Sequence, residues 1–439
     1  MPETIITTKE NRQLGEKYHR IRHRSGLDIY VFPKDFATCY ALFGTRYGSV
    51  DNCFRIKGEE EFTRVPDGIA HFLEHKMFEN KNGEDTFARF ARAGAQANAF
   101  TSFMRTAYLF SCTENMEQSL EILLDYVTSP YFTPENVAKE QGIIAQEIRM
   151  GEDNPGRMLT FDLLRSLYER HNVRLEIAGT VESIEKITAD TLYQCYRAFY
   201  NLQNMALCVC GPITAEQVLA AADRILRPQP DLEVESVHAE EKAEVFRPRF
   251  ARQMAISKPL YNIGVKDTDI SPDPIARCRK SVAMNIICDI LFGRTGKLFN
   301  SLYSEGVING MGYWFEHNKS FSLISVSGET EDPDLVYDRF LSAVREAART
   351  GFAREDVERC RRVLYADYLR SFESTSSIAN SFLNFLFDDC DLLDFGEILG
   401  SVTMEEIDGV FRSLFREEHF ALSAIYPLGD SRGADETEG

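Results

Sequence analysis

The sequence lacks an apolar run long enough to cross a membrane, and its polar first residues lack the apolar core of a secretory signal. It also lacks a basic excess: 49 Lys and Arg stand against 68 Asp and Glu, a net charge of -19. This charge repels nucleic-acid phosphates and anionic membranes, so we expect neither as a partner. Solubility alone can account for the excess of acidic residues, and a preference for basic peptides is the alternative explanation.

The ten cysteines contain no CxxC pair and lie mostly in apolar stretches, such as residues 207–210. This distribution is typical of buried free thiols in a reducing compartment. We therefore expect a cytoplasmic protein. Apolar residues make up 44% and charged residues 27%, proportions that are ordinary for a folded globular chain.

With 439 residues the chain exceeds what one hydrophobic core usually serves, so two domains are expected. The last part of the first half also matches the last part of the second half at an offset of 215 residues: Thr188 corresponds to Thr403 and Leu207 to Leu422. Both matched segments read as an amphipathic helix followed by a strand, although two such units can also resemble each other by chance. The ranges expected are a metal-binding domain at 1–230, a linker at 231–247, a similar metal-free domain at 248–430 and a polar tail at 431–439.

Apolar periodicity predicts both strands and helices in each half. The expected strands are 28–33, 38–44, 95–101 and 106–112, then 252–257, 261–265, 310–315 and 321–327. The expected helices are 68–78, 114–128 and 134–150, then 274–291, 333–349 and 355–372. This mixture indicates an α+β fold of two similar domains, each a mainly antiparallel sheet covered by helices.

One helix carries a metal-binding pattern. At about 100° per residue His71 and His75 share a face, with Glu74 beside them and Asp67 as the expected N-cap. Imidazoles at i and i+4 can both bind one zinc ion, which leaves the carboxylate of Glu74 next to an attacking water as a general base. This HxxEH order is the inverzincin signature. The alternative is two unrelated histidines with an incidental glutamate.

A catalytic zinc site needs a third protein ligand. In the helix after Pro134, Glu140 and Glu147 share a stripe with Ile143 and Ile144, where a carboxylate is costly to bury unless it is paired or binds a cation. We predict that Glu147 is the third ligand and that Glu140 orients a ligand histidine. Two solvated glutamates would give the same pattern in an isolated helix.

Over nearly its whole length the chain resembles the pitrilysin and mitochondrial-processing-peptidase family of inverzincins. The resemblance lies in residues 68–75, 98–102, 140–147 and 179–184. It implies a half-clamshell of two α+β domains with one Zn²⁺ per chain, and a second chain that closes a chamber. It also implies that an extended peptide binds beside Asn98 and Ala99, although this segment can equally be an ordinary strand.

The family pairs a Tyr with an Arg seven residues earlier to hold substrate and stabilise the oxyanion. Tyr313 matches the Tyr position, but Gly306 stands at the Arg position. The resemblance therefore predicts a heterodimer with a metal-free paralogous subunit, with a homodimer as the other arrangement.

The sequence predicts a zinc-dependent peptidase, and the resemblance implies an endopeptidase that hydrolyses peptides or unfolded segments. The main alternative is a non-catalytic peptide-binding or scaffold subunit of the same fold. A structural zinc site is a weaker alternative, because such sites normally close with four protein ligands.

Overall fold

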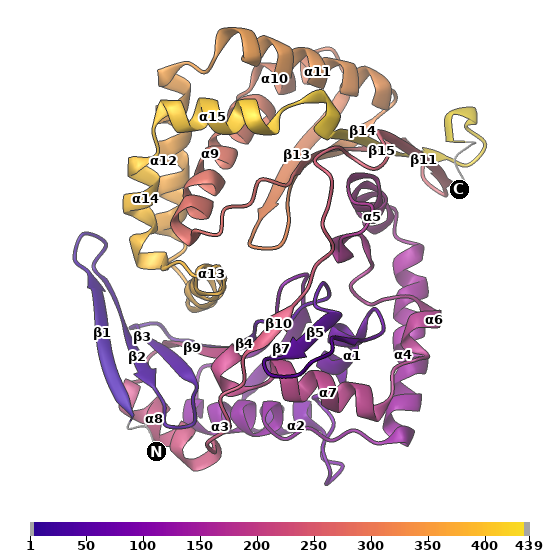
Figure 1. Ribbon diagram of the computed structural model, residues 1–439. Coiled ribbons are helices and arrows are strands. Elements are labelled where there is room, and N and C mark those ends of the chain that lie inside the picture. The colour runs from indigo at the N-terminus through magenta and orange to yellow at the C-terminus, as the bar shows by residue number, and fades with distance from the viewer. Residues whose placement is uncertain (1–3, 434–439) are drawn as a thin grey trace. The chain divides into compact units, whose positions relative to one another are not determined.

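The computed structural model of the protein describes residues 4–433, and these form two compact units (Figure 1). The first unit comprises the residues through Ile148 together with Leu175–His238 and Leu369–Asp394. The second comprises Arg149–Arg174, Ala239–Tyr368 and the residues from Phe395 onward. Each unit contains one main sheet with helices packed against it.

The main sheet of the first unit has the strand order β1-β2-β3-β9-β4-β8-β7, in which only β3 and β9 run parallel. Its strands are β1 (Ile5–Asn11), β2 (Glu16–Arg22), β3 (Asp28–Pro33), β4 (Cys39–Thr45), β7 (Ala95–Thr101), β8 (Thr106–Cys112) and β9 (Met205–Gly211). A small sheet, β10-β5-β6, contains β5 (Cys53–Ile56), β6 (Thr63–Arg64) and β10 (Val234–Ser236). The helices are α1 (Ile69–Lys76), α2 (Thr86–Arg92), α3 (Met116–Val127), α4 (Pro134–Glu152, which continues into the second unit), α6 (Val181–Ile184), α7 (Ala189–Phe199), α8 (Ala215–Ile225) and α13 (Thr375–Phe387).

The sheet of the second unit has the order β11-β15-β12-β14-β13, in which only β11 and β15 run parallel. Its strands are β11 (Arg249–Met254), β12 (Leu260–Asp267), β13 (Ile308–His317), β14 (Ser322–Thr330) and β15 (Phe420–Pro427). Its helices are α5 (Pro155–Leu167), α9 (Pro274–Phe292), α10 (Lys297–Ser304), α11 (Pro333–Thr350), α12 (Arg354–Arg370), α14 (Phe395–Ser401) and α15 (Met404–Leu414).

The two sheets repeat one topology. Strands β3-β9-β4-β8-β7 correspond in order and direction to β11-β15-β12-β14-β13, and the first unit adds β1 and β2 at one edge. The helix before the matched strand begins in the same way in both units: Thr188 caps α7 and Thr403 caps α15, each through a capping box. The predicted α+β fold of two similar halves is thus confirmed.

Each sheet is covered by a helix from the other half of the sequence. Helix α13, late in the chain, packs on β4 and β9, whereas the early helix α5 packs on β12 and β15 (Figure 1). Glycine permits both close contacts: a Cβ at Gly44 would lie 2.6 Å from Leu383 Cδ2, and one at Gly264 would lie 2.8 Å from Leu163 Cδ1. Each of the continuous ranges 1–230 and 248–430 therefore contains a segment that belongs to the other unit.

Several regions differ from the sequence expectations, among them the following three. The hairpin β1–β2 was not predicted, because β1 is largely exposed and the two buried residues of β2, Tyr18 and Ile21, do not follow the alternation of a strand. The expected linker 231–247 contains a short strand, Val234–Ser236, that pairs with β5. Of the tail predicted at 431–439, residues 431–433 form a 3₁₀ turn and residues 434–439 lie outside the described part of the chain.

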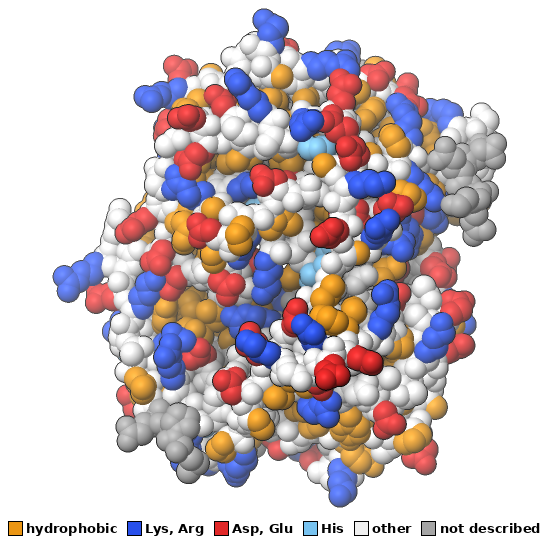
Figure 2. Space-filling model, viewed as in Figure 1, with side chains coloured by type: hydrophobic (Ala, Val, Ile, Leu, Met, Phe, Trp, Pro, Cys, Tyr) orange, Lys and Arg blue, Asp and Glu red, His pale blue; other side chains and the backbone are white. Residues whose placement is uncertain are grey.

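The surface is charged and of mixed sign. Acidic and basic side chains are interspersed over the face drawn in Figure 2, although acidic residues predominate in the composition. Between residues 4 and 433, no helix combines the length and the apolar content that crossing a bilayer requires.

Candidate metal centre

Helix α1 begins where two glycine backbones meet. Gly68 caps the helix with φ 88°, and a Cβ there would lie 2.3 Å from the carbonyl oxygen of Ala178. A Cβ at Gly179, which has φ 76°, would lie 2.5 Å from the carbonyl oxygen of Asp67, and the Ser183 hydroxyl donates to that oxygen at 2.8 Å. Only glycine adopts these angles without strain and permits the approach, so this contact fixes the start of the helix. The expectation that Asp67 is the N-cap was wrong: its side chain accepts a hydrogen bond from Asn52 instead.

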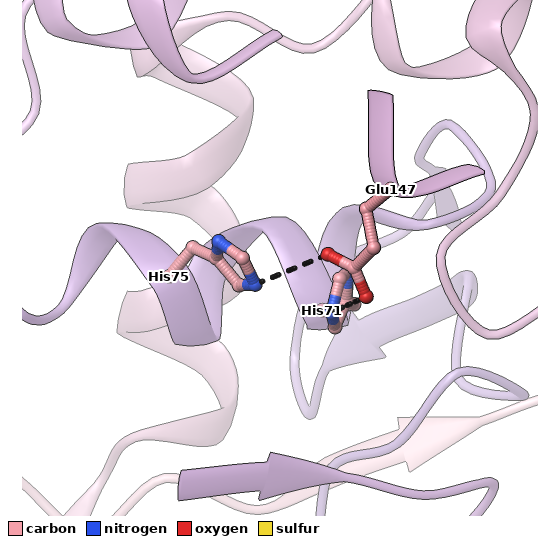
Figure 3. Close-up of side chains that lie close together, drawn as sticks. All are labelled: His71, His75 and Glu147. Atoms are coloured by element: carbon pink, nitrogen blue, oxygen red, sulfur yellow. Dashed lines mark ion pairs between the residues drawn. The ribbon is translucent and has the colours of Figure 1, made fainter. Parts of the chain in front are cut away.

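The side chains of His71, His75 and Glu147 point toward one another (Figure 3). Glu147 Oε1 lies 3.5 Å from His71 Nε2, and Glu147 Oε2 lies 3.6 Å from His75 Nε2. The two imidazole rings are 4.6 Å apart between centroids. Among the described residues, these three form the one group of His, Cys, Asp or Glu side chains whose donor atoms all lie within 4.8 Å of one another.

This donor set fits a zinc ion. Ligand atoms about 2.0 to 2.1 Å from a tetrahedral centre lie roughly 3.4 Å apart, close to the two nitrogen–oxygen distances in the structure. Two imidazole nitrogens and one carboxylate are also a ligand combination that catalytic zinc sites use. Three protein donors would leave a fourth position for water or substrate.

Glu140 lies behind His75, on the side away from Glu147. One of its carboxylate oxygens accepts from His75 Nδ1 at 3.1 Å, and its other oxygen lies 3.8 Å from the ammonium group of Lys76. Lys76 is completely buried and also contacts Glu79 at 2.9 Å. This arrangement fixes His75 with Nε2 toward Glu147.

The same contacts shift the pKa of both partners. Burial raises the pKa of Glu140, but the hydrogen bond from His75 and the charges of His75 and Lys76 outweigh it, so the pKa lies below its ordinary value. Burial lowers the pKa of His75, but the carboxylates of Glu140, Glu74 and Glu147 outweigh it and raise the pKa. Both shifts favour a charge-assisted hydrogen bond between the two side chains.

Glu74 lies beside the two histidines on α1 and is only 8% exposed. The Thr101 hydroxyl, at the end of β7, donates to Glu74 Oε2 at 2.6 Å. Burial raises the pKa of Glu74, and the nearby charge of Glu147 adds to the rise, while the Thr101 bond and His75 oppose it. A carboxylate whose pKa moves toward neutrality suits a general base better than an ordinary glutamate does.

The other predicted site residues lie on edge strands. Asn98 and Ala99 are on β7, which pairs only with β8 among the described strands; Asn98 is exposed and Ala99 half-buried. Tyr313 is half-buried on β13 of the second unit, and its role stays a prediction.

Sequence reasoning missed two residues and misplaced one. Thr101 follows Ala97 and Ala99 at the period of two, which could have placed it on the covered face of β7. Lys76 belongs to a short polar stretch with apolar residues on both sides, which indicates a buried, paired charge. Ile143 does not share the buried stripe of Ile144: it is 49% exposed, whereas Ile144 is fully buried.

Comparison with known proteins identifies the family. Residues 63–181 match the family model described as Insulinase (Peptidase family M16), and residues 186–364 match that of the Peptidase M16 inactive domain. The chain is 38% identical over 430 residues to a Bacillus subtilis protein named uncharacterized zinc protease YmfH, a match that covers 96% of this chain and all of the relative. The chain therefore belongs to peptidase family M16.

Solved structures show the same fold. An M16-like peptidase from Alicyclobacillus acidocaldarius superposes with a TM-score of 0.89 at 32% identity, over 97% of this chain and 99% of that one. Pitrilysin superposes with a TM-score of 0.74 at 15% identity, over 98% of this chain and 46% of that one. At that identity the pitrilysin match concerns the fold alone.

Proposed function

We propose that this chain is a zinc-dependent endopeptidase, in which His71, His75 and Glu147 hold the metal and Glu74 is the general base. The observation that carries the proposal is the convergence of these three donors beside a buried carboxylate that is not one of them. The names of its relatives support the choice of zinc. The inverzincin arrangement supports the choice of reaction.

Zinc, when bound there, supplies a Lewis acid that polarises the scissile carbonyl and makes a water easier to deprotonate. Glu74 accepts the proton of the attacking water and later delivers it to the nitrogen of the leaving amine. Thr101 holds one oxygen of that carboxylate, so the base keeps its direction through the cycle. Glu140 holds His75 in the tautomer that directs Nε2 toward Glu147.

The substrate binds as an additional strand along β7. The outer edge of β7 is unpaired among the described strands, and the C-terminal residue of β7 contacts the general base. Backbone groups around Asn98 and Ala99 can therefore hydrogen bond to an extended peptide. Such binding depends on the peptide backbone, which suits peptides and unfolded segments better than folded proteins.

A second chain completes the chamber. This chain covers only 46% of the pitrilysin chain whose fold it shares, which supports an assembly of two such halves. Because Gly306 stands seven residues before Tyr313, a homodimer would lack the expected Arg. We therefore favour a metal-free paralogue that supplies the Arg and Tyr. Full peptidase activity of this chain on its own would contradict the heterodimer and leave the metal site unaffected.

Metal analysis combined with a peptide-cleavage assay tests the catalytic proposal. We expect about one zinc per chain in the wild type and in Glu74→Gln, with cleavage by Glu74→Gln lower by roughly 10²- to 10⁴-fold. Glu147→Gln should lose zinc, whereas Glu135→Gln, at an exposed position of the same helix, should keep it. A zinc-loaded wild type that cleaves nothing, alone or with its co-purified partner, would favour the non-catalytic subunit.

A further inference from the structure

Two cysteines face each other in the sheet of the first unit. Cys39 is the first residue of β4, Cys112 is the last residue of β8, and the two are direct partners in the antiparallel register. Direct partners project from the same face, with Cβ atoms roughly 4.5 to 5.5 Å apart. Their backbone separation falls within the range of about 4.4 to 6.8 Å between Cα atoms that a disulfide spans. Both thiols are reduced in the structure.

The two thiols have different surroundings. Cys39 is completely buried, whereas Cys112 retains 4% exposure. Cys112 interacts with the Cys39 thiol, with the Ser119 side chain and with the backbone of Glu114. These interactions outweigh burial and lower the pKa of Cys112, whereas the interaction with Cys112 and burial raise the pKa of Cys39. Cys112 is therefore placed to react first and Cys39 to respond.

We propose that Cys39 and Cys112 form a redox modification site, at which hydrogen peroxide converts the thiol pair into a cross-strand disulfide. The Cys112 thiolate attacks one peroxide oxygen, so an S–O bond forms, the O–O bond breaks and hydroxide leaves as water after taking a proton. The Cys39 sulfur, its proton lost to the leaving oxygen, then attacks the sulfenic sulfur, so the S–S bond forms and a second water departs. Two thiols are oxidised by two electrons in total, and one peroxide is reduced to two waters.

The bond would close a loop of the chain from Cys39 to Cys112, a stretch that contains α1 and β7. No other cysteine among residues 4–433 has a cysteine as its direct partner in a strand register. The pair should therefore oxidise more readily to a disulfide than the other eight thiols. This inference does not depend on the proposed peptidase activity.

Mass spectrometry of the full chain tests the proposal. Tryptic cleavage gives the peptides 35–46 and 106–139, each with a single cysteine. After hydrogen peroxide, an acid quench and N-ethylmaleimide in denaturant, we expect these two peptides to be linked, two hydrogens lighter than their sum, and separable by dithiothreitol.

Three variants test the role of each cysteine. Cys39→Ser should leave Cys112 as a sulfenic acid that dimedone traps, and Cys112→Ser should leave Cys39 fully alkylated after the same treatment. Cys53→Ser, which removes a more exposed cysteine outside the pair, should leave the yield of linked peptide unchanged within about twofold. The proposal is overturned if peroxide leaves both wild-type peptides fully alkylated, or if Cys112 links to another cysteine instead.

Discussion

Replacing Thr101 by valine should impair catalysis while leaving the metal in place. Valine keeps the shape and suits a strand, but it removes the hydroxyl that donates to Glu74 Oε2 at 2.6 Å. A hydrogen bond to a charged group contributes about 1.5 to 3 kcal/mol. If the bond acts by orienting the general base, its loss should lower kcat by about 10- to 100-fold. Glu74 is not a ligand, so zinc content should stay at the wild-type value.

The assay is steady-state cleavage of a quenched-fluorescent peptide that the wild-type preparation hydrolyses, together with metal analysis of the same samples. Thr101→Ser keeps the hydroxyl and should retain kcat within about threefold, which separates the hydrogen bond from packing. KM should change little, because the side chain of Thr101 contacts the base. A zinc-loaded Thr101→Val enzyme with wild-type kcat would refute the reasoning.

Three further outcomes are expected. Glu140→Gln weakens the hold on His75, so zinc affinity measured by competition with a chelator should fall by about 10- to 100-fold; an unchanged affinity would argue against an orienting role. Gly264→Ala crowds Leu163 and should lower the free energy of unfolding by about 1 to 3 kcal/mol in urea denaturation. Gly310→Ala, where a Cβ would have open space around it, should lower this free energy by less. Burial lowers the pKa of His317 to about 4, so the unfolded state binds a proton before the folded state does as the pH falls from 6.5 to 4. The free energy of unfolding should therefore fall by about 3 kcal/mol over this pH range, and His317→Asn should reduce that loss.

The sequence predicted the local part of the site because helical periodicity is a local property. Residues 71 and 75 lie on one face of any helix, and α1 begins within one residue of its expected start. The approach of Glu147 depends on tertiary structure, and the helical pattern left it open. The seven-residue separation of Glu140 and Glu147, which the resembling family shares, favoured it. The Asp67 cap failed for the opposite reason: a distant backbone at Gly179 decides where the helix begins.

The exchanged helices could not be predicted from either half. The apolar face of α13 shows that the helix is buried, but it carries no information about which sheet it covers. The strands of the core were easier to predict, because β3, β7 and β8 are bounded by turns and rich in apolar or β-branched residues. The hairpin of β1 and β2 was harder to predict, because β1 is largely exposed and β2 buries only Tyr18 and Ile21.

The late position of α13 in the chain has a consequence for biosynthesis. The strands of the first sheet have all been synthesised once residue 211 is made, yet the helix that covers β4 and β9 follows more than 160 residues later. A nascent chain therefore carries an apolar sheet face whose covering helix has not yet been made, and such surfaces promote aggregation. Chaperone engagement during translation should accordingly begin near the end of β9 and cease only after Phe387 has emerged.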